Sequence, residues 1–250
     1  MGPTSRVIAK ASAFAKTLAV VAVYSLTACS GAGLDSLPSA GSGVAVSADG
    51  EGRVRLADGR TVRLAGVEVA DETALHRLVA GQAVELLSVG PNPDAVQLRV
   101  KHGRRWVQGD LLEQGLARVR TAPNEAALTE AMLSREAQAR VRAQGLWDSR
   151  WRVLTAEEAE DARGFQIVEG RVRSAKALRR GVFLDFGENW REDLSVEVPG
   201  DALDRFAAAG RDPEALEGRL VRVRGRLQPT RNGPLITLDH PEALEVLQEP

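Results

Sequence analysis

The sequence predicts a mainly β protein of the α+β class, built as two small barrels in succession. Short segments in which apolar and polar residues alternate recur along the chain, and a period of two is typical of half-buried strands. Turn residues separate these segments, and only a few stretches show the 3.6-residue period of a helix. With 250 residues, the chain is long enough for two small domains. Because the strand pattern restarts after residue 163, we expect two.

The first 28 residues predict an export signal. Arg6, Lys10 and Lys16 precede an apolar run, Leu18–Leu26, that is too short to span a bilayer but has the length of a signal-peptide core. We therefore expect an exported protein.

The end of this run resembles the lipobox of bacterial lipoproteins. Its residues are Leu26-Thr27-Ala28-Cys29, and Cys29 is the one cysteine of the chain, so no disulfide can form within it. The resemblance implies lipid attachment at Cys29 and a membrane-anchored protein that faces the periplasm, with Ser30 favouring the outer membrane. An ordinary cleaved signal with a coincidental cysteine is the alternative.

The composition argues against binding of nucleic acid through bulk charge. The whole chain has a formal net charge of −1 from 33 basic and 34 acidic residues, and the three basic residues of the signal leave the mature chain near −4. Aromatic residues make up 4%, so few rings are available for base stacking. Nucleic acid remains a candidate partner, but we expect weak binding because the sequence shows no strong basic patch.

A tether and a hairpin follow the signal. Ser30–Ser47 is rich in Gly and Ser, which predicts a flexible linker; we place the tether at residues 29–42 and the first domain at 43–150. Val54 and Leu56, and then Val62 and Leu64, alternate with polar residues and predict two strands. Asp58-Gly59 between them predicts a type I′ turn.

The rest of the first domain predicts further strands and three helices. Asp71 opens a short amphipathic stretch that ends at Gly81, and the longest helix is predicted between Pro123 and Gly145. The other predicted elements are strands at 83–89, 95–101, 104–107 and 116–120, and a helical turn or two at 109–114.

A linking helix and a second barrel complete the prediction. Residues 151–163 are predicted as a linker, with a helix at 155–163, and residues 164–250 as an OB-like barrel. The expected elements of this barrel are strands at 166–173, 182–186, 194–198, 220–227, 235–238 and 244–247, and a helix at 201–209 capped by Asp201. We expect Arg171, Arg173, Arg222, Arg224 and Arg226 to lie on one solvated strand face.

Three segments in order resemble the thermonuclease (staphylococcal-nuclease-like) family, whose fold is a five-stranded barrel with three helices. They are Arg60–Glu68 (RTVRLAGVE), Asp110–Val119 (DLLEQGLARV) and Glu136–Trp147, which holds EAQAR and then GLW. Val168–Val172 and Val223–Leu227 resemble the barrel that follows such domains in some exported bacterial homologues.

The resemblance implies metal-assisted hydrolysis of phosphodiesters. In that family two Asp and a backbone carbonyl hold Ca²⁺, a Glu acts on the attacking water, and two Arg stabilise the charge on phosphorus. By position, Arg63 matches the first Arg and Asp71 the Glu. Glu68 matches one metal Asp, followed by Val69 in place of the residue that offers its carbonyl.

The sequence departs from the family pattern at two charged positions. Gly52 stands where the other metal Asp is expected, although Glu51 or Asp49 could replace it. Ala95 lies near the position of the second Arg, and Arg99 follows four residues later. A charge clamp of this kind is worth about 2–4 kcal/mol in the transition state.

Each candidate also has a structural interpretation. Arg63 could lie on the solvent face of the hairpin, Asp71 could cap its helix, and Glu68 could be an ordinary strand-end carboxylate. The histidines at 76, 102 and 240 are too scattered for a metal cluster, and the tryptophans at 106, 147 and 151 are expected in packing, with Trp190 the one candidate for ligand stacking.

Two functions follow from these patterns. The first is a lipid-anchored protein with a degraded nuclease site that serves as a binding or scaffolding module. The second is a working Ca²⁺-dependent nuclease for DNA or RNA that uses Arg63, Asp71, Glu68 and Glu51. The missing charges at Gly52 and Ala95 favour the first.

Overall fold

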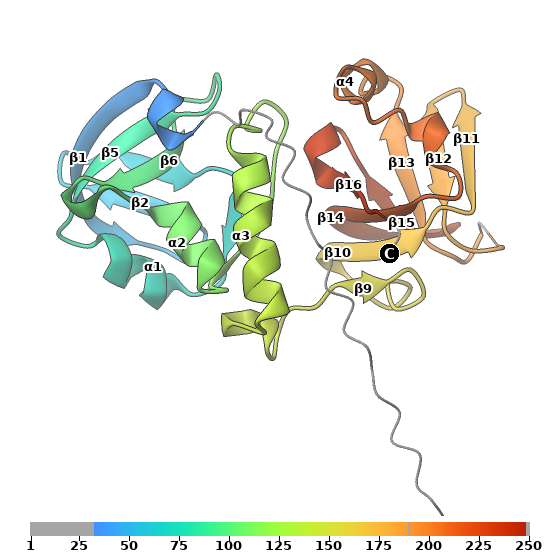
Figure 1. The fold of residues 1–250 in the computed structure, drawn as a ribbon, viewed down its shortest axis with the longest axis horizontal. Helices are drawn as coiled ribbons and strands as arrows, with labels where there is room; N and C mark the ends of the chain where they lie inside the picture. Colours follow the sequence, from blue (N-terminus) through green and yellow to red (C-terminus); the bar gives the residue numbers. More distant parts are fainter. Residues whose placement is uncertain (1–32, 190, 249–250) are drawn as a thin grey trace, which may run out of the picture.

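The computed structural model describes residues 33–189 and 191–248. The predicted signal, Cys29 and Trp190 lie outside these residues. The described part is an α+β structure with 16 strands and four α-helices, arranged as two lobes on either side of one long helix (Figure 1). Among the described helices, none is both long and apolar enough to cross a membrane.

The first lobe is a curved sheet that closes on itself. Its strands follow the order β3-β2-β1-β5-β6-β7, and β3 also pairs with β6 in parallel, which joins five strands in a ring. The strands are β1 (Ser39–Ala48), β2 (Arg53–Leu56), β3 (Thr61–Leu64), β5 (Ala83–Ser88), β6 (Ala95–Val100) and β7 (Arg105–Trp106). A separate pair, β4 (Val67–Val69) and β8 (Ala117–Val119), is antiparallel.

The predicted hairpin is present, but its turn is of another type. Strands β2 and β3 pair as expected, with Val54 opposite Val62 and both side chains buried. Gly59 has a φ of +90°, whereas Asp58 stays in the usual negative region, so the two residues do not form a type I′ turn. Instead the Gly59 amide bonds to the Leu56 carbonyl, and the Leu56 amide to the Arg60 carbonyl, across a longer loop.

Three helices cover the first lobe. They are α1 (Glu72–Val79), α2 (Val107–Glu113) and α3 (Thr129–Val141). The stretch from Asp71 to Gly81 is confirmed as a helix. The longest helix starts six residues after Pro123, because Leu128 takes a left-handed conformation with φ +68° and the chain turns before it.

The second lobe is an eight-stranded sheet with one helix. Its order is β11-β12-β13-β15-β14-β10-β9, with β16 paired to β14. The elements are β9 (Leu154–Thr155), β10 (Gly164–Arg171), β11 (Ser174–Leu178), β12 (Gly181–Asp185), β13 (Ser195–Pro199), α4 (Leu203–Ala208), β14 (Leu220–Thr230), β15 (Gly233–Thr237) and β16 (Leu244–Val246). Val221 and Val223 of β14 point into its core, so Arg222 and Arg224, which alternate with them, point outward.

Three local predictions are wrong. The expected tether is partly strand β1, and before it Asp35 forms ion pairs with Arg99 and Arg104, which hold this segment on the first lobe. The linking helix is absent; residues 156–161 form turns after β9. Asp201 caps nothing, because α4 begins two residues later with Ala202 at its N-cap.

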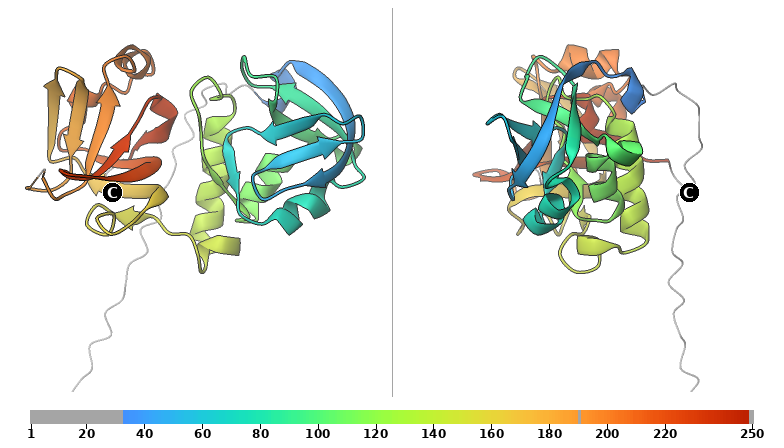
Figure 2. Two further views of the ribbon diagram at one scale, coloured as in Figure 1. Left: turned by 180° about the vertical axis from the view of Figure 1, so that it is seen from behind. Right: turned by 90° about the vertical axis from the view of Figure 1, so that its left-hand side faces the viewer.

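A third apolar cluster joins the lobes. Trp147 and Trp151 pack edge to face with ring centres 5.5 Å apart, and they share this cluster with Ile167 of β10 and Ala139 of α3. The left view of Figure 2 shows α3 between the two sheets from behind. The predicted packing role of these two tryptophans at the domain junction is thus observed.

Candidate functional site

Arg63 and Asp71 both have partners that fix local structure. The Nη2 of Arg63 donates to Glu125, whose side chain is 9% exposed. The Oδ1 of Asp71 accepts the Ala74 amide at 2.9 Å and caps α1, as the structural interpretation predicted. An acceptor that is committed to its own helix is poorly placed to take a proton from water.

The carboxylates of Glu51 and Glu68 do not come together to bind one metal ion. Glu51 lies on an exposed turn, 72% of its side chain is accessible, and it pairs with Arg53 at 2.7 Å. Glu68, on β4, accepts from the Nη2 of Arg118 at 2.9 Å and lies 3.5 Å from the Nη1 of Arg120. The two carboxylates are thus each neutralised by different arginines.

At the two positions that depart from the family pattern, no nearby side chain of the described residues takes the place of the missing charged group. Gly52 has a φ of +75°, which favours glycine, and it has no side chain that could bind a metal; its carbonyl accepts the Leu64 amide at 2.9 Å. Ala95 pairs with Arg63 across β6 and β3. Arg99 is nearly buried and donates to Glu85 at 2.6 Å; this bond, together with Asp35 and against the effect of burial, raises the pKa of the guanidinium.

The residues expected to hold Ca²⁺ therefore do not fit that ion. Ca²⁺ takes six to eight oxygen ligands, several of them carboxylate. Across residues 33–189 and 191–248, no group of three or more His, Cys, Asp or Glu side chains is placed to bind a metal. Glu51, Glu68 and Asp71 instead serve a turn, a strand pair and a helix end.

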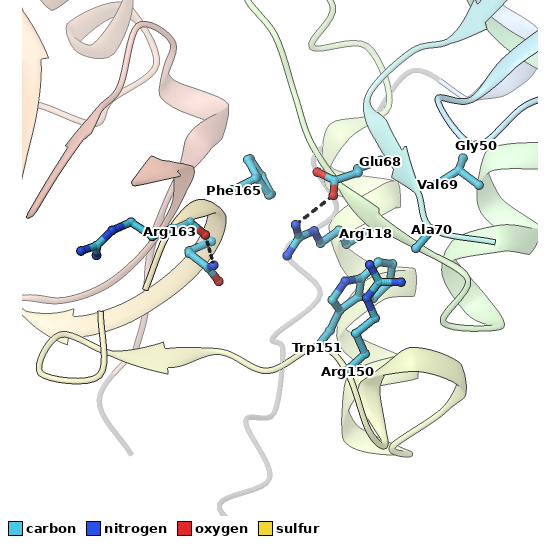
Figure 3. Close-up of a pocket in the computed structure, with 10 residues that line it drawn as sticks. Gly50, Glu68, Val69, Ala70, Arg118, Arg150, Trp151, Arg163 and Phe165 are labelled. Carbon is cyan, nitrogen blue, oxygen red and sulfur yellow. Dashed lines mark hydrogen bonds and ion pairs between the residues drawn. The ribbon is translucent and has the colours of Figure 1, made fainter. Parts of the chain in front are cut away.

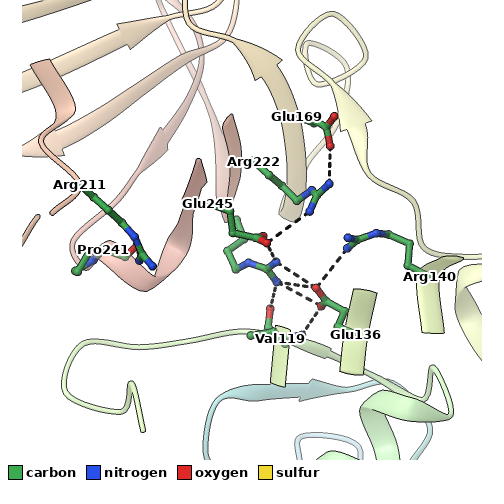
Figure 4. Close-up of polar contacts among 9 residues, drawn as sticks. Val119, Glu136, Arg140, Glu169, Arg211, Arg222, Pro241 and Glu245 are labelled. Atoms are coloured by element: carbon green, nitrogen blue, oxygen red, sulfur yellow. Dashed lines mark hydrogen bonds and ion pairs between the residues drawn. The ribbon is translucent and has the colours of Figure 1, made fainter. Parts of the chain in front are cut away.

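The contact between the lobes contains a buried ion cluster, shown in Figure 4, of three arginines and three glutamates. Its centre is Arg224 on β14, which donates to Glu136 of α3 at 3.1 Å and to Glu245 of β16 at 2.7 Å. Both Arg224 and Glu136 have side chains only 1% exposed. The members of the ion cluster are Glu136, Arg140, Glu169, Arg222, Arg224 and Glu245.

The ion cluster links the backbone of one lobe to the side chains of the other. Glu136 accepts the Val119 amide at 2.7 Å, and Arg224 donates to the Val119 carbonyl at 3.1 Å. Burial opposes the charge on Arg224, but attraction to Glu136 and Glu245 outweighs it and raises the pKa of the guanidinium. The pKa of Glu245 is lowered, because Arg224 and Arg222 overcome its burial.

The expectation of a solvated arginine face is wrong for the centre of β14. Arg224 is 2% exposed, since the outer face of β14 is the face that meets the first lobe. His240 also belongs to this contact: it is 7% exposed, and its Nε2 lies 2.6 Å from Thr121 Oγ1 of the other lobe. Its Nδ1 lies 2.6 Å from Asp239 Oδ1.

Next to the ion cluster the lobes leave an open pocket, here called the junction pocket. It has a volume of about 410 Å³ and is drawn in Figure 3. Glu68, Val69 and Ala70 form one wall, so the pocket adjoins the stretch that carries the family resemblance. The remaining lining residues are Gly50, Arg118, Arg150, Trp151, Arg163, Phe165 and Gln166.

Aromatic rings hold the central arginine of the junction pocket. The guanidinium of Arg118 lies 5.3 Å from the ring centre of Trp151 and 4.8 Å from that of Phe165. Arg120 lies 5.4 Å from the same Phe165 ring. In Figure 3 the side chain of Arg163 points away from Glu68, so this residue lines the pocket without directing its charge into it.

Sequence reasoning missed Glu136, Arg224 and Arg118 as partners. One signal was present for each. Glu136 follows the buried Met132 by four residues and so lies on the same helical face. Arg118 lies between the buried Ala117 and Val119, and Arg224 follows the buried Val223, so the alternation predicted which face each arginine occupies but not what covers that face.

Comparison with known proteins does not identify a family. Neither a scan against protein-family models nor a search of curated proteins finds a match to this chain.

Proposed function

We propose that this chain is an exported, lipid-anchored protein that pairs a thermonuclease-like barrel with an OB-like barrel and serves as a binding or scaffolding module in the periplasm. The order of the three resembling segments supports the first barrel, as does the closed ring of five strands with three helices. The eight-stranded second lobe with one helix is compatible with the OB-like assignment.

One observation carries the proposal of binding rather than hydrolysis. Every side chain that the resemblance assigns to catalysis has another partner: Arg63 has Glu125, Asp71 has the amide of Ala74, and Glu68 has Arg118. A catalytic constellation needs its groups within about half an ångström of a productive geometry. Groups that are engaged in separate local structures do not meet that requirement.

Incubation of purified residues 30–250 with labelled single-stranded DNA or RNA tests this proposal. With Ca²⁺ or Mg²⁺ in excess, we expect no cleavage above a buffer control. Cleavage that is lost in both Arg63→Ala and Glu68→Gln would contradict the proposal and support the alternative, a Ca²⁺-dependent nuclease.

The anchor is tested separately in cells. The lipobox-like segment supports acylation at Cys29, and Ser30 supports the outer membrane. We expect labelled palmitate to enter the wild-type protein and the protein to sediment with outer membranes. The Cys29→Ser variant should take up no label; equal labelling of both proteins would exclude this attachment site.

A further inference from the structure

The junction pocket carries an excess of positive charge. Arg118 is neutralised by Glu68, and Arg120 is the next cation, 3.5 Å from the same carboxylate. Arg150 lies on the lining, is exposed, and has no carboxylate partner among the described residues. Glu68 is thus the one glutamate among the described lining residues, against Arg118 and Arg150 on the lining and Arg120 next to it.

A fourth arginine comes from the second lobe. Arg226 of β14 lies directly opposite Phe165 of β10. Opposed residues of an antiparallel pair project from the same face with their Cβ atoms about 5 Å apart, so Arg226 flanks the ring that Arg118 and Arg120 also approach. Arg226 is exposed and, like Arg150, has no carboxylate partner in the described part of the chain.

Nearby carboxylates do not balance this charge. Glu72, in the first turn of α1, lies beside Gly50 on the rim and is the second acid to count. Asp49 is bound by Arg53, and Asp71 by its own helix. Four arginines against two glutamates leave about two positive charges around a pocket that is open to solvent.

The rings favour an anionic group over an aromatic ligand. Guanidinium groups already lie over both rings: Arg118 over Trp151 at 5.3 Å, and Arg118 and Arg120 over Phe165 at 4.8 and 5.4 Å. A ligand is therefore recognised by charge and hydrogen bonds. The guanidinium fork matches phosphate oxygens in pairs, and a phosphate monoester carries about −1.5 to −2 charges at neutral pH, which matches the excess.

From this geometry we propose that the junction pocket binds a phosphate monoester. Arg150 and Arg226 contact the phosphate from opposite lobes, Arg118 is the fixed cation of the wall, and Arg120 lies behind it beside Glu68 and Phe165. A volume of about 410 Å³ leaves space for an organic group beside the phosphate. The inference rests on the proposed function, since it names the ligand class of that binding module.

Calorimetry with glycerol 3-phosphate in EDTA tests the assignment on residues 30–250. We expect binding that weakens at high salt, and weaker binding of succinate, a dicarboxylate of equal charge. Arg150→Gln with Arg226→Gln should weaken the binding of glycerol 3-phosphate at least about tenfold. The control is Arg55→Gln, an exposed arginine on β2 outside the lining, which should bind as wild type.

Three results would overturn the proposal: no binding of glycerol 3-phosphate, equal binding of succinate, or unchanged affinity in the double variant with a wild-type melting curve. Vesicles that contain phosphatidic acid form a second arm. Vesicle binding that the double variant loses would support the site and make a lipid headgroup the source of the phosphate. Because EDTA removes divalent metals, a nuclease activity found with Ca²⁺ would refute the binding-only function without affecting this result.

Discussion

The ion cluster and the junction pocket lie side by side in the contact between the lobes and differ in charge balance. In the ion cluster three arginines meet three glutamates, and Arg224 and Glu136 are almost completely buried. In the junction pocket four arginines meet Glu68 and Glu72, and Arg150 and Arg226 are exposed. Buried charge must be paired, whereas unpaired charge at the surface is free to bind a ligand.

The difference shows that two arginines on one strand can have different roles, one paired and buried and the other exposed and unpaired within the described residues. Arg224 and Arg226 are two residues apart on β14 and project from the same face. The first meets α3, whose Glu136 neutralises it, and the second lies beyond the helix beside Phe165. The contact beyond the strand, rather than the strand itself, decides which arginine stabilises the fold.

The largest expected effect is the loss of the central cation of the ion cluster. Arg224→Met keeps much of the side-chain volume but leaves Glu136 and Glu245 buried without their main partner. We expect the free energy of unfolding to fall by about 3–5 kcal/mol in urea denaturation.

The matched control is Arg173→Met, which removes an ion pair with Glu188. The side chains of Arg173 and Glu188 are 55% and 82% exposed. Exposed pairs contribute about 0–1 kcal/mol, so this variant should unfold close to wild type. Equal losses in the two variants would mean that the ion cluster does not hold the lobes together.

Acid should weaken the ion cluster next. The pKa of Glu245 in the folded chain lies below its ordinary value of 4.5, so the unfolded chain takes up a proton first as the pH falls. The stability that Glu245 contributes is present above about pH 4.5 and is lost as the pH drops through the lowered value. Thermal melts from about pH 7 to about pH 3 should show this decline.

The Glu245→Gln variant should start less stable and lose less on acidification. Some slope should remain, because Asp49 and Asp58 also have lowered pKa values. Glu188→Gln, at an exposed position, should keep the wild-type slope. An identical slope in wild type and Glu245→Gln would remove Glu245 from the pH dependence.

A smaller effect is expected at the border of the junction pocket. Asp71→Ala removes the cap of α1 and should cost about 1 kcal/mol in denaturant unfolding. Asp71→Asn retains a side-chain acceptor and should unfold within a few tenths of wild type. If both variants were equally unstable, the charge of Asp71 would matter more than its hydrogen bond.

The smallest expected change in stability is at Arg226. Arg226→Gln should change the free energy of unfolding by no more than about 0.5 kcal/mol, since the side chain is exposed and has no carboxylate partner in the described residues. Chemical denaturation of Arg226→Gln and Arg224→Met in parallel therefore compares the contributions of the two arginines to stability. A loss as large as that of Arg224→Met would place Arg226 in the structural contact.

Sequence reasoning succeeded where one segment carries its own signal. The alternation of Val54, Leu56, Val62 and Leu64 predicted the hairpin, and Asp71 predicted a helix start, because both depend on neighbours in the chain. It failed where distant segments decide. The small residues of the expected tether gave no sign that Ser39–Ala48 pairs with β5, 40 or so residues away.

The same limit applies to the candidate site. Arg63, Glu68 and Asp71 could be found from the motif, and so could the cap that Asp71 gives to α1. The partners of the other two come from distant segments: Glu125 before α3 binds Arg63, and Arg118 on β8 binds Glu68. Spacing along the chain predicts which face a residue occupies. It does not predict which charged residue of the other lobe lies against that face, such as Glu136 against Arg224.

The central claim is that the carboxylates at the catalytic positions stabilise structure and hold no metal. Titration calorimetry of Ca²⁺ into residues 30–250, compared with Glu68→Gln, tests it most directly. We expect the two proteins to give the same heats, with no binding isotherm that depends on Glu68. A Ca²⁺ isotherm in the wild type that Glu68→Gln abolishes would contradict the claim.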